Sequence, residues 1–197
     1  MKTKIINFIF IILFFLSLTN CTKVGRFGTG VDITFDPRTI GMQIDDSIMQ
    51  KNLKARLSLH NKKYLLGIQV EVIDGRIFLS GKVNDPEEKL KITKMAWETK
   101  GTRSVKSAIA IKDKMNFKGT AKDVLITSQL RTALIFNKLV KATNYNIDTI
   151  KGKTYVFGIA MTDDEKKEVI KEANEVYGVK QVIPSIILVK DLSRNKN

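Results

Sequence analysis

Residues 66–83 read LGIQVEVIDGRIFLSGKV, in which apolar and polar side chains alternate along two runs separated by Asp74 and Gly75. Alternation with a period of two is typical of a β-strand with one buried face. An Asp-Gly pair between two such runs is a strong signal for a β-hairpin. Residues 145–161, YNIDTIKGKTYVFGIAM, repeat this pattern around Lys151 and Gly152. The sequence therefore predicts two β-hairpins.

The two hairpins belong to a longer internal repeat. Residues 46–111 align with residues 123–188 without a gap, at a constant offset of 77 positions. The matched pairs include Asp46 and Asp123, Leu53 and Leu130, Leu57 and Leu134, Gly75 and Gly152, Gly81 and Gly158, and Gly101 and Gly178. A repeat of this regularity indicates two copies of one folding unit.

Each copy also predicts a helix before its hairpin and a second helix after it. Apolar residues recur every four positions behind Asp46 and behind Asp123, and an aspartate at such a place can cap a helix through its side chain. The second helices begin with capping sequences, Asp85-Pro86 in the first copy and Thr162 to Glu165 in the second.

A glycine, Gly101 or Gly178, is expected to end the second helix of each copy. A last apolar run follows each glycine, so that the order in each copy is α-β-β-α-β. We predict an α+β fold with two tandem modules, residues 45–113 and residues 122–190. Each module is expected to be a three-stranded mixed sheet packed against two helices.

The N-terminus predicts export. Lys2 and Lys4 precede an apolar block from Ile5 to Leu18, which is shorter than the ~20 apolar residues that a transmembrane helix needs. A charged start, a short apolar core and a small-residue exit are typical of a secretory signal peptide. We therefore assign residues 1–20 to a signal peptide that takes no part in the fold.

Cys21 is the single cysteine of the chain and follows this signal directly. Residues 18–21 resemble the lipobox of bacterial lipoproteins, in which the cysteine receives diacylglycerol before cleavage. The resemblance implies that residues 21–44 form a leader anchored by acyl groups on Cys21, palmitate among them, without any spanning helix. Thr22, in place of an aspartate, then implies the outer membrane. The alternative is a leftover cysteine in a signal peptide that is cut elsewhere.

The duplicated body resembles the BON domain, a module of exported bacterial proteins. The resemblance rests on the helix leucines, on Asp74-Gly75 followed by residues 78–81, and on Gly101 with Ser104-Val105. Two such copies behind a lipobox are similar to the outer-membrane lipoproteins called division and outer membrane stress-associated lipid-binding proteins. Residues 114–121 would then be a linker between the modules, and residues 191–197 a C-terminal tail.

The segment from Asp36 to Asp46 is similar to the one that precedes the first module in that family. Its Asp-Pro pair predicts a turn, and we expect an extended arm to follow it. Arg38 in this arm is expected to be solvated.

The resemblance implies binding rather than catalysis. It implies a protein on the periplasmic side of the outer membrane that contacts anionic phospholipid through the first helix of its second module, here residues 123–136, and maintains outer-membrane integrity. This helix is apolar at Val124 and Ile135, where the first copy has Ser47 and Ser58, although a half-exposed helix should be polar there. The predicted contact residues are Lys122, Val124, Leu125, Arg131, Ile135, Phe136 and Lys138.

Other interpretations of these side chains stay open. Val124 and Ile135 could instead pack against the first module, because two joined modules need an interface. Leu125 and Phe136 are matched by the apolar residues Ile48 and Leu59 in the first copy, so they could be packing residues.

The charge of the chain limits its partners. It carries 34 Lys and Arg residues against 20 Asp and Glu residues, a formal net charge of +14, and only Lys2 and Lys4 of these lie in the signal. Such a surplus suits nucleic acid or an anionic membrane surface, and export argues against nucleic acid. The alternative is that the charge only keeps the protein soluble.

The sequence does not favour an enzyme. His60 is the only histidine, and no second histidine or free cysteine is available to complete a metal site. The acidic residues 163–165 fit the start of a helix. We expect no catalytic residue, no metal, no cofactor beyond the acyl groups and no small-molecule substrate. The alternative function is an adaptor that docks on envelope proteins, such as a protease, a secretin or the outer-membrane assembly machinery.

Overall fold

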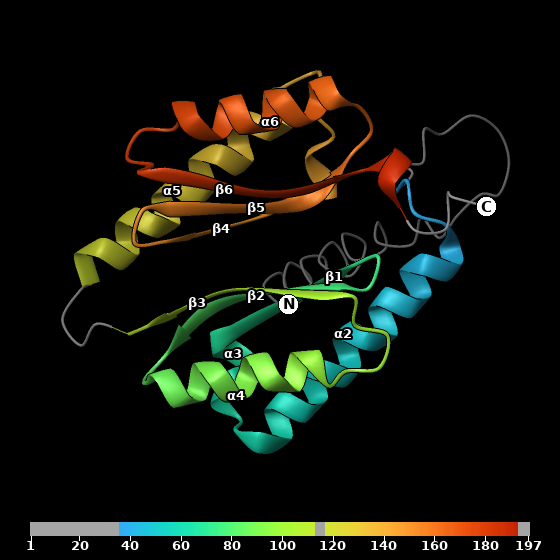
Figure 1. Ribbon diagram of the computed structural model, residues 1–197. Coiled ribbons are helices and arrows are strands. Elements are labelled where there is room, and N and C mark those ends of the chain that lie inside the picture. The colour runs from blue at the N-terminus through green and yellow to red at the C-terminus, as the bar shows by residue number, and fades with distance from the viewer. Residues whose placement is uncertain (1–35, 113–116, 193–197) are drawn as a thin grey trace, which may run out of the picture. The chain divides into compact units, whose positions relative to one another are not determined.

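The computed structural model describes residues 36–112 and 117–192 (Figure 1). The predicted signal peptide, Cys21 and the leader up to residue 35 lie outside the described residues, as do residues 113–116 and 193–197. The described residues belong to one compact unit, which contains both modules.

Both modules have the predicted order of helix, strand, strand, helix and strand, with short extra turns. The first module consists of α2 (Ile40–His60), α3 (Lys63–Gly67), β1 (Ile68–Ile73), β2 (Arg76–Val83), α4 (Pro86–Trp97) and β3 (Ser104–Ile111). The second consists of α5 (Phe117–Phe136), the 3₁₀ turn η2 (Ala142–Asn144), β4 (Tyr145–Ile150), β5 (Lys153–Ala160), α6 (Asp163–Glu175), β6 (Gln181–Leu188) and the 3₁₀ turn η3 (Val189–Asp191).

Each module contains one three-stranded mixed sheet. In the first sheet, β2 lies between β1, to which it is antiparallel, and β3, to which it is parallel. In the second, β5 has the same relation to β4 and β6. In Figure 1, α2 and α4 cover one face of the first sheet, and α5 and α6 cover one face of the second. The predicted α+β fold is confirmed.

The hairpin turns have the backbone conformation that their sequences predict. Asp74 and Gly75 have φ values of 52° and 70°, and Lys151 and Gly152 have φ values of 56° and 78°. Positive φ at both central residues defines a type I′ turn, whose twist matches that of the flanking strands. Both hairpins are therefore confirmed, including the one whose first turn residue is a lysine.

The predicted starts of the first helices are wrong. Thr39 caps α2 by accepting a hydrogen bond from the Met42 backbone N–H at 3.3 Å, so the expected extended arm is helical from Ile40 onward. A threonine at the N-cap satisfies an N–H group that the helix leaves without a partner. α5 likewise begins at Phe117, and Asp46 and Asp123 lie inside their helices.

The two aspartates bind the hairpin turns instead. The Asp46 carboxylate accepts the backbone N–H groups of Asp74 and Gly75 at 2.8 and 2.9 Å. Asp123 accepts those of Lys151 and Gly152 at the same two distances. Buried N–H groups of a tight turn need acceptors, and a carboxylate from the neighbouring helix supplies both. Each first helix is thereby fixed to its sheet.

Gly101 and Gly178 have positive φ values of 89° and 95°, as the C-cap prediction requires, but they lie beyond the helix ends at Trp97 and Glu175. In the first module, the Ala96 carbonyl at the end of α4 accepts from the hydroxyl of Thr102 at 2.9 Å. The Thr102 side chain in the following loop thus partly caps α4. Gly101 lies in this loop and is not the residue that caps the helix.

Each module has its own apolar core between helices and sheet. In the first, Leu53 and Leu57 of α2 pack with β-strand residues and with Ile92 of α4. In the second, Leu130 and Leu134 of α5 occupy the matching positions. The leucine stripes predicted from the sequence are therefore buried as expected.

A third apolar cluster joins the two modules. It contains Met42, Ile73, Phe78, Phe157, Ile159 and Leu192. Ile77 and Leu79 of β2 belong to the core under the helices, whereas Phe78 between them points to the other face of the sheet. The rings of Phe78 and Phe157 lie 4.8 Å apart between centroids. The modules therefore pack through the sheet faces that carry no helix.

Candidate functional site

The helix α5 presents large apolar side chains to solvent. Val124 is 61% exposed and Ile135 is 68% exposed, and Leu125, Phe136 and Leu139 of the following loop are exposed as well. Ile126, Leu130 and Leu134 on the opposite side of the same helix are fully buried. Exposed apolar residues that cluster on one element are typical of an interaction surface. We call Val124, Leu125, Ile135 and Phe136 the apolar face of α5.

The alternative interpretation of Val124 and Ile135 as module-interface residues is wrong. The modules meet at the cluster around Phe78 and Phe157, and α5 takes no part in it. Leu125 and Phe136 are not packing residues either, because both are exposed. The residues that match them in the first module, Ile48 and Leu59, are exposed as well.

Basic side chains border the apolar face of α5. Lys122, Arg131 and Lys138 are exposed. Arg131 donates a hydrogen bond to the Ile147 carbonyl at 3.2 Å, which holds its guanidinium on the β4 side of the helix. The Lys122 ammonium lies 6.0 Å from the centroid of the Tyr177 ring. The seven residues predicted as a contact surface thus lie on one helix and the turn after it, and none of them is buried.

The far end of α5 is tied to α6 by side-chain hydrogen bonds. The Asn137 amide donates to the carboxylates of Glu168 and Glu172 at 3.1 and 2.7 Å. Hydrogen bonds from Lys171 and Asn137 hold the pKa of Glu168 below its ordinary value. Glu168 therefore stays charged, and the helix that carries the apolar face has a fixed position on the module.

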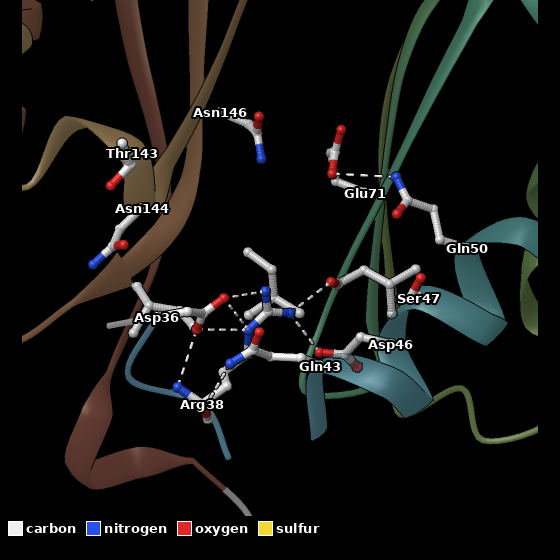
Figure 2. Close-up of a pocket in the computed structure, with 13 residues that line it drawn as sticks. Asp36, Arg38, Gln43, Asp46, Ser47, Gln50, Glu71, Thr143, Asn144 and Asn146 are labelled. Atoms are coloured by element: carbon white, nitrogen blue, oxygen red, sulfur yellow. Dashed lines mark hydrogen bonds and ion pairs between the residues drawn. The ribbon is translucent and has the colours of Figure 1, made fainter. Parts of the chain in front are cut away.

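Arg38 forms ion pairs that the sequence did not indicate. It was expected to be solvated, but its guanidinium pairs with Asp36 at 2.5 Å and with Asp46 at 2.7 Å, and it donates to the Val72 carbonyl at 3.3 Å. Burial acts to raise the pKa of Asp36, but the hydrogen bonds from Arg38 hold that pKa below its ordinary value. The arginine thus fastens the segment before α2 to the first module (Figure 2).

A small polar pocket lies beside Arg38, between the two modules (Figure 2). Its volume is about 150 Å³, and its lining includes Gln50 and Glu71 from the first module and Asn144 and Asn146 from the second. Burial raises the pKa of Glu71, although Lys54 and Arg38 oppose the shift. A pocket of this size with polar walls suits ordered water better than an organic ligand.

His60 is exposed at the end of α2, with its ring 6.1 Å from that of Tyr64. Within residues 36–112 and 117–192, no group of three His, Cys, Asp or Glu side chains could hold a metal ion. Nor does any helix in this part of the chain have the length and hydropathy to cross a membrane.

Residues 45–113 and 122–190 both match the BON domain. The chain belongs to the BON-domain family. The matches begin within α2 and α5 and include α3, α4, α6 and both sheets. The family that the sequence resembles is confirmed at this level.

Relatives of this BON protein include proteins of several bacteria. It is 34% identical over 146 residues to a protein in the gshII 5′ region of Anaplasma centrale, a match that covers 74% of this chain and 95% of the relative. It is 25% identical to the outer membrane lipoprotein DolP of Haemophilus influenzae, covering 81% of this chain and 83% of DolP. It is also 25% identical to a 21 kDa hemolysin of Actinobacillus pleuropneumoniae, with 79% and 80% covered.

Proposed function

We propose that this BON protein is a non-enzymatic outer-membrane lipoprotein that binds anionic phospholipid through its second module and helps to maintain the integrity of the outer membrane. In this proposal, acyl groups on Cys21 anchor the chain, and the two modules face the periplasm. The observation that carries the proposal is the apolar face of α5 with its basic border. The similarity to an outer membrane lipoprotein supports the location.

The surface has the chemistry of a membrane contact. Burying one large apolar side chain contributes about 1.5–3 kcal/mol, and each basic residue near an anionic surface adds about 1 kcal/mol. The four side chains of the apolar face and the three bordering bases would therefore both contribute to reversible binding. An acyl chain on Cys21 adds ~0.8 kcal/mol for each buried methylene, so the anchor and α5 would engage the same leaflet.

Replacing Val124 and Ile135 tests the role of α5. The mature chain with Cys21→Ser, which lacks the anchor, should float with vesicles that contain phosphatidylglycerol. The Val124→Asp, Ile135→Asp variant should lose at least tenfold in vesicle affinity, because a carboxylate near ionised headgroups is repelled and must be desolvated. Its circular dichroism should stay unchanged, since both side chains are exposed.

The matched control is Ser47→Asp with Ser58→Asp at the equivalent positions of α2. It introduces the same charge into the first module and should leave flotation within about twofold of the starting protein. If the Val124→Asp, Ile135→Asp variant floated as well as the starting protein, α5 would not be the membrane contact.

The second candidate is an adaptor that docks on envelope proteins. It is favoured by exposed leucines on the first module, where Leu59 is 88% exposed and Leu66 is 93% exposed. Ionic strength separates the two functions. Lipid binding through charge weakens as salt rises, whereas an adaptor would ignore vesicles and copurify with one envelope protein.

A further inference from the structure

A groove lies along α2 of the first module, between this helix and the loops at one end of the sheet. Its volume is about 520 Å³, within the range of about 300–1,000 Å³ that is typical of sites for small organic ligands. The lining runs from Met42 to Asn52 on the helix, so the groove follows α2 for about 15 Å at a rise of about 1.5 Å per residue. The hairpin turn and the loop before β3 line the other side with Gly75, Lys100, Gly101 and Arg103. We call it the α2 groove.

The buried part of the α2 groove contains two methionines. Met42 and Met49 are buried, and Ile48 adds a half-exposed apolar side chain at the rim. The carboxylates of Asp46 and Asp74 also line the groove, but the first binds the hairpin turn and the second binds arginine side chains. Methionine is flexible and polarizable, and it adapts to apolar partners of irregular shape. The groove therefore offers an apolar chain a place beside α2.

The second module shows how such a groove can be covered. Lys122 stands at the position of Asp45, and Tyr177 stands at that of Lys100. The Lys122 side chain crosses Gly178, where a Cβ atom would lie 2.8 Å from the Cε atom of the lysine. Its ammonium lies 6.0 Å from the centroid of the Tyr177 ring. In the second module, a lysine stem thus lies across the place that corresponds to the α2 groove.

The first module has a shorter side chain at the place of this lysine. Asp45 is too short to cross Gly101 in the way that Lys122 crosses Gly178. Gly101 has a φ of 89°, and a Cβ atom there would lie 3.3 Å from the Met49 sulfur. A glycine is favoured here because another residue would be strained and would press on the methionine. The α2 groove is therefore open where its counterpart is covered.

Cations stand on the loop side of the α2 groove. Lys100 and Arg103 are both exposed and both line it. Arg103 already pairs with the Asp74 carboxylate, so the guanidinium lies where a carboxylate can reach it. Asp45 stands on the opposite, helical side, and its charge disfavours an anion there. A ligand with an apolar chain and one anionic end would therefore place that end on the loop side.

We propose that the α2 groove binds a fatty acid, with its aliphatic chain beside Met42 and Met49 and its carboxylate at Lys100 and Arg103. Ammonium and guanidinium groups form charge-assisted hydrogen bonds with carboxylates, and burial of the chain supplies the apolar contribution. The site lies on the first module and uses none of the residues of the apolar face of α5. It is therefore independent of the proposed function.

The test is an NMR titration of the mature Cys21→Ser chain, labelled with ¹³C at its methionine methyl groups, with decanoate below its micelle concentration. The Met42 and Met49 signals should shift saturably, whereas the signal of Met161, an exposed residue of the second module, should not. Octanoate should bind about fifteenfold more weakly, because each buried methylene contributes about fourfold in affinity. An absence of saturable shifts at Met49 with decanoate overturns the proposal.

The charge of the head is tested with decyltrimethylammonium, which has the same chain and a cationic end. It should bind at least tenfold more weakly than decanoate, because the cations on the loop side repel it. Equal binding of the two amphiphiles overturns the assignment of the groove to a fatty acid.

The decisive variant is Asp45→Lys with Lys100→Tyr, which copies the covering side chains of the second module into the first. It should weaken decanoate binding by about tenfold or more, because the lysine stem then lies across Gly101 and the Lys100 cation is lost. It should not unfold the protein, since both replaced side chains are exposed and the same pair stands at Lys122 and Tyr177. Unchanged decanoate affinity in this variant overturns the α2 groove as the site.

A second variant, Lys100→Gln, tests the position of the carboxylate. It should weaken decanoate binding by up to about fivefold, as the loss of an exposed ion pair does, and leave the binding of neutral decanol within about twofold. An equal loss for decanol would show that Lys100 does not bind the head. The matched control is Lys51→Gln, an exposed lysine of the same module, which should leave both affinities within about twofold.

Discussion

At the scale of single residues, Asp46 and Asp123 occupy equivalent positions in the two modules and differ in one interaction. Asp46 and Asp123 each accept two backbone N–H groups of a hairpin turn, and Asp46 also binds Arg38. The chain therefore contains a matched pair of sites that differ by one ionic contact, which makes the energetic role of Arg38 measurable.

We expect Asp123→Ala to lower the free energy of unfolding by about 2–4 kcal/mol, because it leaves two buried N–H groups without acceptors. Asp46→Ala should cost about 1–2 kcal/mol more, because it also takes one partner from the half-buried Arg38 guanidinium. Urea denaturation measures both. In Arg38→Ala the cost of Asp46→Ala should fall to that of Asp123→Ala, and equal costs in the unmodified background would contradict this account.

At the scale of elements, periodicity predicted the strands and the buried faces of the helices, and the capping sequences predicted the starts of α4 and α6 after Asp85 and Thr162. The starts of α2 and α5 were predicted wrongly. The alternation around Asp74-Gly75 and Lys151-Gly152 fixes strand faces and turn type, because a shift by one residue would expose every buried side chain. The four-residue spacing of the leucines likewise identified the buried side of α2 and α5. These features are local, and the structure confirms each of them.

The wrong starts of α2 and α5 have a common cause. Asp46 and Asp123 have the side chain of a helix cap, and sequence spacing cannot tell a cap from an acceptor for a turn 28 residues further on. The real cap of α2 is Thr39, which lies about two turns of helix before Asp46. The expectation that Arg38 is solvated failed because its partner Asp46 and the Val72 carbonyl meet it only in the folded module.

The exposed face of α5 was predictable because the repeat supplies a comparison within one chain. Serines at positions 47 and 58 identified the solvent side of the first helix, so Val124 and Ile135 stood out as apolar residues on that side. The module interface was not predictable. Phe78 and Phe157 alternate with core residues on their strands, and a strand with both faces buried gives no signal of which face meets another module.

At the scale of the whole molecule, the two cores are coupled through the cluster around Phe78 and Phe157. We expect Phe78→Ala to lower the free energy of unfolding by about 3–5 kcal/mol, as for other buried phenylalanines. Because the cluster joins the modules, unfolding should change from one transition to two in urea. Phe136→Ala, which removes an exposed ring, should change stability by about 0.5 kcal/mol or less. A single transition after Phe78→Ala would contradict this coupling.

The central claim, that the second BON module binds an anionic phospholipid surface, is tested most directly by flotation of the mature Cys21→Ser chain with vesicles of defined composition. The account predicts flotation with vesicles that contain phosphatidylglycerol, little or none with phosphatidylcholine alone, and a loss of binding as salt is raised toward 1 M, where the screening length falls to about 3 Å. Protein that stays at the bottom of the gradient with anionic vesicles at low salt would contradict it.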